Sequence, residues 1–348
     1  MLARSYFLAA ALCFSANALS AQPAFKILHY TETSGHDHGT RQVSLQLFQA
    51  LGAMYNFQVD DDNDGSGFNS LSNLQQYAIV VFSNTSGNAI LTPAQQTNFE
   101  NYINGGGSLL GIHAASDTYR HSTANGANTG GWDWYAQTLG ASVQENPNHV
   151  SGTPLYNLHK IGQHASTDNL PEPWAKNEEY YYWENGYYNS ANTAVLEVEQ
   201  TIGPNNQVNS YDSARPMSWY RNLGGGGKVF YTALGHATSN YTSDQLFIAH
   251  IRDAIFWMVG VSGIPDPSAQ PALLFQNPVE ASLELWMRHQ SSASAITLCD
   301  ALGKTVYTGQ IAAGQTQHSV DLRNLRAGVY VLRLETAEGM LVRKVVKR

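Results

Sequence analysis

Residues 108–113 read Ser-Leu-Leu-Gly-Ile-His, a short apolar run that ends on a histidine. Such a run, without polar alternation, is typical of a strand that is buried on both faces of a sheet. Phe25–Tyr30 (FKILHY), Tyr77–Phe82 (YAIVVF) and Lys228–Leu234 (KVFYTAL) have the same character. The sequence therefore predicts several buried, parallel strands.

Helical patterns separate these strands. Apolar residues recur at helical spacing between Val43 and Met54, and Ser243–Val259 is amphipathic. Thr92-Pro93 supplies an N-cap and a first-turn proline for a helix that ends at Gly105. The alternation predicts an α/β fold with a flavodoxin-like, doubly wound, mostly parallel sheet.

The segment between Trp132 and Arg221 is aromatic and polar, and its order cannot be predicted beyond short strands at 194–200 and 215–220. Ser262–Pro271 is rich in proline and small residues, as linkers are. The C-terminal part shows alternating strands, turn residues and no helical pattern, which predicts a small all-β sandwich. Its expected strands are 282–287, 295–299, 304–307, 317–321, 329–334 and 341–346.

The N-terminal segment has the pattern of a cleavable secretory signal. Arg4 precedes an apolar run up to Phe14, and small residues continue to Ala21. A buried N-terminal helix is the alternative, but Gln22-Pro23 breaks the pattern. No later stretch approaches the roughly 20 apolar residues of a spanning helix. The expected organisation is a signal at 1–21, a main domain at 22–261, a linker at 262–271 and a sandwich at 272–348.

Cysteine content and charge exclude several classes of site. Cys13 would leave with the signal, so Cys299 would be the only thiol, and neither a disulfide framework nor a cysteine-based zinc site is possible. Met1–Ile264 contains ten Lys/Arg against 20 Asp/Glu. Nucleic-acid binding needs clustered basic residues, so it is not expected of such an acidic domain.

Histidines follow the expected strands at the edge where open α/β sheets bind ligands. They are His36 and His38 after the first strand, His113 after a central strand and His236 after the last. Imidazole can act as a general acid or base, or bind a divalent metal such as zinc, and Glu179 could add a carboxylate. A structural role is the alternative for each histidine, and the spacing does not fix a metal geometry.

The densest aromatic run is Glu179–Tyr188 (EYYYWENGYY). Rings with interspersed carboxylates suit a sugar, although core packing is an alternative for each ring. Trp183 and Trp219 are the expected sugar contacts, with Asp117 as a further substrate-binding residue.

The main domain resembles the ThuA-like (trehalose utilisation) family, which has the class I glutamine amidotransferase-like fold. The likeness runs over about residues 25–260 and rests on the order and spacing of several motifs. These are Ser34–His38, Phe82–Gly87, Gly105–Thr118, Trp134-Tyr135, Glu179–Tyr181, Arg215–Trp219 and Phe230–His236.

One departure excludes the best-known chemistry of this fold. Glutamine amidotransferases hold a nucleophilic cysteine in the turn where this sequence has Gly111-Ile112-His113. Because the mature main domain lacks cysteine, it is not expected to be a thiol-dependent glutamine amidotransferase. We expect His113 to face a cleft at this turn rather than the core.

The tail resembles the C-terminal sorting domain of the type IX secretion system; a glycan-binding sandwich is the alternative. The resemblance implies export across the outer membrane and a secreted or cell-surface location, with the secretion machinery as a partner. It rests on Phe275–Pro278, Asp300–Val306, Asp321–Leu325, Ala327–Tyr330 and Arg343–Val346.

Together these patterns predict a secreted ThuA-like protein that is an enzyme of carbohydrate metabolism. Its substrate would be a sugar or glycoside, and its chemistry would be His/Glu acid–base catalysis, with or without a metal, by hydrolysis, elimination or isomerisation. The expected catalytic residues are His36, His113, Glu179 and His236. The alternative is a glycan-binding surface protein without catalytic activity.

Overall fold

The computed structural model of the chain describes most of the main domain and of the tail. The expected signal at 1–21 and the expected linker at 262–271 lie outside the described residues. The described residues are 24–120, 131–185, 187–260, 273–275, 278–287, 292–300, 303–315, 317–336 and 339–348.

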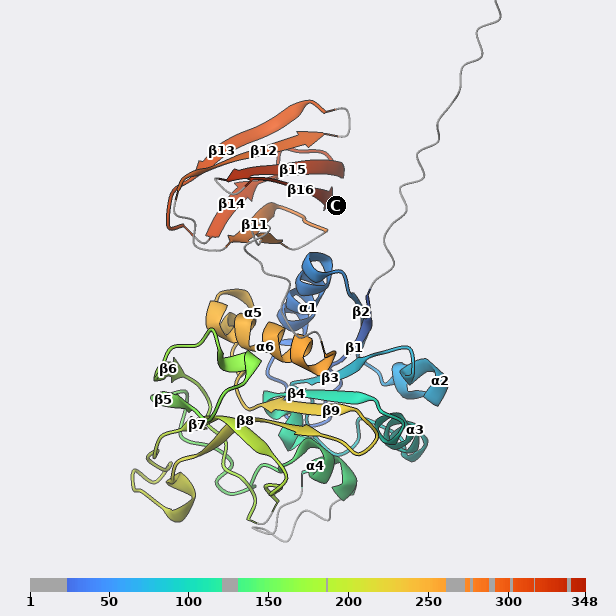
Figure 1. Cartoon of the computed structure of the whole chain (residues 1–348), viewed down its shortest axis with the longest axis vertical. Helices are drawn as coiled ribbons and strands as arrows, with labels where there is room; N and C mark the ends of the chain where they lie inside the picture. Colours follow the sequence, from blue (N-terminus) through green and yellow to red (C-terminus); the bar gives the residue numbers. More distant parts are fainter. Residues whose placement is uncertain are drawn as a thin grey trace, which may run out of the picture.

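A nine-stranded sheet forms the centre of the main domain, in the order β2-β1-β3-β4-β9-β8-β7-β5-β6 (Figure 1). The first five strands in this order pair in parallel. They include the four apolar runs of the sequence, which confirms the predicted α/β fold with a mostly parallel core. Their bounds are β2 Gln58–Asp62, β1 Lys26–Tyr30, β3 Ile79–Ser83, β4 Ser108–Ile112 and β9 Lys228–Thr232.

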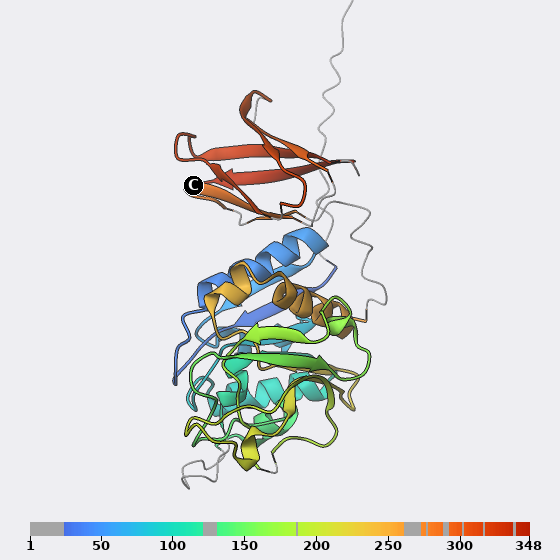
Figure 2. The same cartoon turned by 90° about the vertical axis from the view of Figure 1, so that its left-hand side faces the viewer.

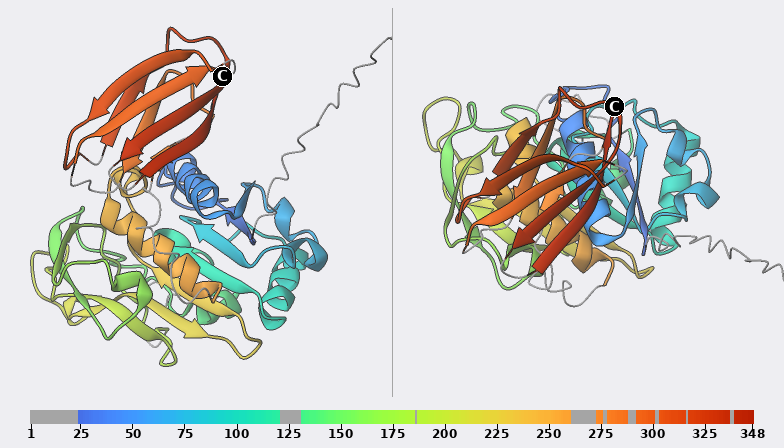
Figure 3. Two further views of the ribbon diagram at one scale, coloured as in Figure 1. Left: turned by 45° about the horizontal axis from the view of Figure 1, so that its top comes forward. Right: turned by 90° about the horizontal axis from the view of Figure 1, so that it is seen from above.

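The other four strands pair antiparallel and extend the sheet beyond β9 (Figure 3). The predicted strands at 194–200 and 215–220 are confirmed as β7 and β8, whereas β5 and β6 had no clear sequence signal. The bounds are β8 Arg215–Asn222, β7 Thr193–Val198, β5 Leu155–Lys160 and β6 Trp174–Asn177.

Helices cover both faces of the sheet, with α1 and α6 on one face and α3 and α4 on the other (Figures 1 and 2). Thr92 caps α3 through a reciprocal capping box with Gln95, which is why this helix starts where the sequence predicts. The α-helices are α1 Arg41–Tyr55, α2 Leu71–Leu74, α3 Pro93–Asn104, α4 Asp133–Leu139, α5 Thr238–Thr242 and α6 Gln245–Met258. The 3₁₀ turns are η1 Ser66–Phe68, η2 His113–Asp117, η3 Ala165–Thr167 and η4 Ser210–Asp212.

The tail is a β-sandwich of a three-stranded sheet, β10-β11-β14, and a four-stranded sheet, β13-β12-β15-β16. Its apolar core, which includes Leu283, Leu298 and Leu332, is separate from that of the main domain. The six strands predicted from the sequence are all present. The strands are β10 Leu273–Phe275, β11 Ser282–Met287, β12 Ser294–Asp300, β13 Thr305–Ile311, β14 Gln317–Asp321, β15 Gly328–Thr336 and β16 Gly339–Lys347.

Candidate functional site

His113 occupies the turn directly after the central strand β4. Its backbone is left-handed, with φ at 48°, and its side chain is 0% exposed. The expectation that this imidazole faces an open cleft is therefore wrong, because the ring is enclosed by the loops that follow the neighbouring strands. His113 Nδ1 lies 2.6 Å from the carbonyl oxygen of Ala233. A carbonyl only accepts, so Nδ1 carries the proton and Nε2 presents a lone pair.

Glu179 enters the site from an extended segment that follows β6. Isolated antiparallel bridges pair Tyr181 with His149 and Trp183 with Val143. Side chains of an extended segment alternate between its two sides. Glu179 and Tyr181 accordingly point toward His113, whereas the hydroxyl of Tyr182 donates to Asp212 on the other side.

Three imidazoles converge on the carboxylate of Glu179. Its Oε2 lies 3.2 Å from His113 Nε2, 3.4 Å from His236 Nδ1 and 3.7 Å from His38 Nε2. One ligand atom from each of these four residues lies within 4.8 Å of the other three. We call His38, His113, Glu179 and His236 the Glu179 cluster. Each comes from a different loop, and three of these loops follow parallel strands.

The cluster holds one stable negative charge. Burial by itself would raise the pKa of Glu179, but the close imidazoles of His113, His236 and His38 outweigh it and hold that pKa far below its usual value. Burial lowers the pKa of His38. The nearby carboxylate of Glu179 raises the pKa of His236, against the effect of burial.

Glu178 fixes the loop that carries His236. Its buried carboxylate accepts hydrogen bonds from the backbone N–H of Gly235 at 2.9 Å and of His236 at 3.2 Å. Asn84, after β3, joins the same loop to the His113 turn, since it donates to the Gly235 carbonyl and accepts from Ala114 N–H. Hydrogen bonds thus connect the loops that follow β3, β4 and β9 next to the cluster.

Two residues of the site were missed in the sequence. His149 Nε2 lies 3.2 Å from the second carboxylate oxygen of Glu179, Oε1, and the His149 side chain is 28% exposed. The Tyr181 hydroxyl lies 3.1 Å from His113 Nε2, and its ring stacks on that imidazole. Both lie in the segment whose order the sequence did not reveal, although the alternation Glu179, Tyr181, Trp183 is a strand-like signal.

The expected site residues fall into two groups. His113, Glu179 and His236 form the cluster, as expected. His36 is exposed and stands outside the cluster, with its ring against that of His38 at 4.7 Å between centroids. His38, which was not among the expected catalytic residues, takes the inner position.

The expected sugar contacts also differ in their surroundings. Trp219 is 0% exposed and donates to the Leu139 carbonyl, so its ring is part of the core and is not available to a sugar. Trp183 is partly buried and donates to the Pro216 carbonyl. Asp117 forms an ion pair with Arg120 at 3.0 Å, and burial raises its pKa while Arg120 opposes that effect.

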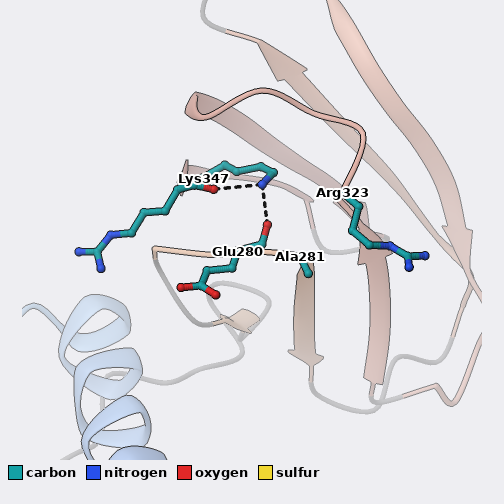
Figure 4. Close-up of a pocket in the computed structure, with 5 residues that line it drawn as sticks. Glu280, Ala281, Arg323 and Lys347 are labelled. Carbon is teal, nitrogen blue, oxygen red and sulfur yellow. Dashed lines mark hydrogen bonds between the residues drawn. The ribbon is translucent and has the colours of Figure 1, made fainter.

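A pocket of about 350 Å³ lies in the tail, apart from the Glu179 cluster. Figure 4 shows its lining, where Lys347 Nζ donates to the carbonyl of Glu280. Arg323 and Lys347 give it basic character, but it has no histidine or paired carboxylates for acid–base chemistry. The Glu179 cluster, and not this pocket, is therefore the candidate functional site.

Residues 26–258 match the ThuA family, described as trehalose utilisation. The chain belongs to this family. The ThuA match covers the whole main-domain sheet, and the family predicted from the resemblance is confirmed. Residues 274–348 match the secretion system C-terminal sorting domain, so this ThuA protein carries a tail that directs it to secretion or to the cell surface.

Two solved structures share the main-domain fold. A ThuA-like protein from Bacteroides uniformis is 22% identical, with a TM-score of 0.54, and covers 70% of this chain and 94% of its own. A ThuA-like protein from Parabacteroides merdae is 18% identical, with a TM-score of 0.51 and the same coverage, 70% and 94%. A search of curated proteins gave no match. Among the described residues, no helix has the length and hydropathy needed to cross a membrane.

Proposed function

We propose that this ThuA protein is a secreted enzyme of carbohydrate metabolism whose reaction centre is the Glu179 cluster. The observation that carries the proposal is the convergence of three imidazoles on one ionised carboxylate, at the strand ends where α/β sheets bind ligands. A purely structural histidine needs one or two hydrogen-bond partners, not a shared carboxylate. Four such groups in one place suit acid–base chemistry on a sugar, with or without a metal.

The substrate class rests on the family and on the groups around the cluster. The family is described as trehalose utilisation. Asp117 can accept hydrogen bonds from sugar hydroxyls, while His36 lies at the exposed side of His38. Trp183 remains a proposed sugar contact through the part of its ring that is not buried. A sugar or glycoside, reacting by hydrolysis, elimination or isomerisation, fits these groups.

The test is a screen of the purified full chain on disaccharides and oxidised (keto) sugars, with analysis of products. We expect product with the wild type and with His159→Ala, an exposed histidine that pairs with Glu172 far along the sheet. Glu179→Gln should lower product formation by about 10²–10⁴-fold. Glycan binding without product, unchanged in Glu179→Gln, would establish the non-catalytic alternative instead.

Export is proposed to use both ends of the chain, a signal at 1–21 and the sorting tail. Deleting Pro265–Arg348 should leave the main domain folded, because the two apolar cores are separate. The deletion should also stop passage across the outer membrane. Truncated protein in the culture medium at the wild-type level would rule out the sorting role.

A further inference from the structure

The spacing within the Glu179 cluster is better suited to ligands around a shared ion than to direct hydrogen bonds. A charge-assisted N–H···O contact is about 2.7–2.9 Å long. The imidazole nitrogens stand 3.2, 3.4 and 3.7 Å from Glu179 Oε2. Ligands about 2.1 Å from a tetrahedral zinc ion are about 3.3–3.4 Å from one another. The observed distances bracket that value.

Two of the imidazoles also have nitrogens without partners. His38 Nδ1 and His236 Nδ1 are buried and have no hydrogen-bond partner among the described residues. Leaving a buried polar atom unpaired is unfavourable, so such atoms usually mark a missing water, ion or ligand. His236 Nδ1 is also the atom that faces Glu179, whereas His38 faces that carboxylate with Nε2. The support from an unpaired atom therefore applies to His236, whose Nδ1 has the position of a ligand and no competing partner.

The surroundings hold the ligands in the form that binds a metal. The Ala233 carbonyl fixes the proton of His113 on Nδ1, which leaves Nε2 free to ligate. His149 contacts Glu179 Oε1, so Oε2 is the oxygen left for an ion. Glu178 fixes the backbone of the His236 loop. These contacts are the kind of outer support that metal ligands have in proteins.

The donor set selects the type of ion. Three imidazole nitrogens and one carboxylate oxygen suit divalent first-row transition metals, whereas magnesium and calcium prefer sites made of oxygens. We propose that His38, His113, Glu179 and His236 bind one divalent transition-metal ion of the zinc type. Four protein ligands fill a tetrahedral shell, so polarising a carbonyl or lowering the pKa of a bound water would need a fifth position on the ion. The inference deepens the proposed function and rests on it for the catalytic role of the ion.

The test is the metal content of the full chain, purified without a histidine tag. After incubation with one equivalent of Zn²⁺ and gel filtration, we expect one zinc per chain. Dialysis against a chelator should remove it and lower the melting temperature, and added Zn²⁺ should restore both. A wild-type protein that retains no zinc and shows no thermal shift would overturn the inference.

Matched variants locate the ion. Glu179→Gln preserves side-chain shape, and His38→Ala removes one imidazole of the cluster. Each should weaken zinc binding by at least about 100-fold. His36→Ala, next to His38, and His159→Ala should keep the wild-type stoichiometry. Full zinc content in Glu179→Gln and His38→Ala would place the metal elsewhere and overturn the assignment.

The two proposals fail in different ways. The protein could bind one zinc per chain, lose it in the ligand variants, and turn over no sugar. That result would support the metal site and rule out the proposed enzymatic function. Turnover by a wild-type protein that retains no zinc would support the enzyme and rule out the metal site, and turnover that persists unchanged after the metal is removed would rule out a catalytic role for the ion.

Discussion

Two sets of histidines occur in the main domain, and they differ in what surrounds them. His29 and His250 are completely buried; His29 lies 2.9 Å from Ser44 Oγ, and His250 lies 2.8 Å from the Ser166 carbonyl and 3.3 Å from Ser218 Oγ. The histidines of the Glu179 cluster instead share one carboxylate, and of these only His113 is completely buried. Burial alone therefore does not separate the two sets. Convergence on a common charged partner does.

The largest expected effect is on turnover when the shared carboxylate is removed. Glu179→Gln should lower turnover of the substrate identified in the screen by about 10²–10⁴-fold, because it removes the charge that organises the three imidazoles. The melting temperature of the same preparation should fall by no more than a few degrees. Normal turnover in this variant would show that the histidines of the Glu179 cluster do not depend on the shared carboxylate for catalysis.

The reverse result is expected for a core histidine. His250→Ala removes contacts to Ser218 Oγ and to the Ser166 carbonyl, both fully buried. It should lower the free energy of unfolding by about 2–3 kcal/mol, measured by urea denaturation. Turnover per folded molecule should be unchanged. A selective loss of turnover would place His250 with the functional set.

His113 belongs to both sets, because it is in the cluster and yet completely buried. His113→Ala should lower turnover by about 10²–10⁴-fold and also destabilise the fold by about 1–3 kcal/mol, since the Ala233 carbonyl loses its donor. Turnover per folded molecule separates the two effects. Destabilisation with normal turnover per folded molecule would end the functional assignment of His113.

The core histidines also predict how stability depends on pH. Burial, together with nearby Arg41, lowers the pKa of His29 to about 3. Burial also lowers the pKa of His250 to about 4, with a smaller contribution from Lys176 and against the raising effects of the Ser166 hydrogen bond and Asp244. Native His29 and His250 stay neutral while the unfolded chain gains protons below about pH 6.5. Each should therefore remove up to about 1.4 kcal/mol of stability per pH unit as pH falls from 6.5 to 4.

The control for this pH dependence is His250→Gln, which cannot titrate. Its free energy of unfolding should fall less steeply with decreasing pH than that of the wild type. The difference in slope should equal the contribution of one histidine, up to about 1.4 kcal/mol per pH unit. Identical slopes in the two proteins would show that His250 is not held neutral by burial.

The smallest expected effect is at the edge of the cluster. His149 contacts Glu179 Oε1 and is partly exposed, so it orients the carboxylate without being enclosed. His149→Ala should lower turnover or zinc affinity by about tenfold and change the free energy of unfolding by less than about 0.5 kcal/mol. A loss as large as that of Glu179→Gln would make His149 an equal member of the cluster.

The sequence predicted the elements that are defined by local patterns. The parallel strands, the helices between them and the strands of the tail follow from apolar runs, caps and turns. His113 and His236 were predicted at the site because each directly follows such a strand. These predictions needed no knowledge of contacts between distant segments.

The remaining features depend on long-range pairing. β5 and β6, which are short and only partly buried, join the sheet through antiparallel contacts that local pattern does not encode. His149 reaches Glu179 because residue 149 pairs with Tyr181. His36 and His38 are equivalent in sequence, and only the path of the loop places His38 inside. Trp219 was expected to contact a sugar, because the sequence does not reveal that its side chain is buried.

Anomalous X-ray diffraction at the zinc edge, from crystals of the full chain loaded with one equivalent of zinc, would locate the ion. We expect one strong peak about 2.0–2.2 Å from nitrogens of His38, His113 and His236 and from a Glu179 oxygen. A peak elsewhere, with the imidazoles hydrogen-bonded directly to Glu179, would rule out this metal site.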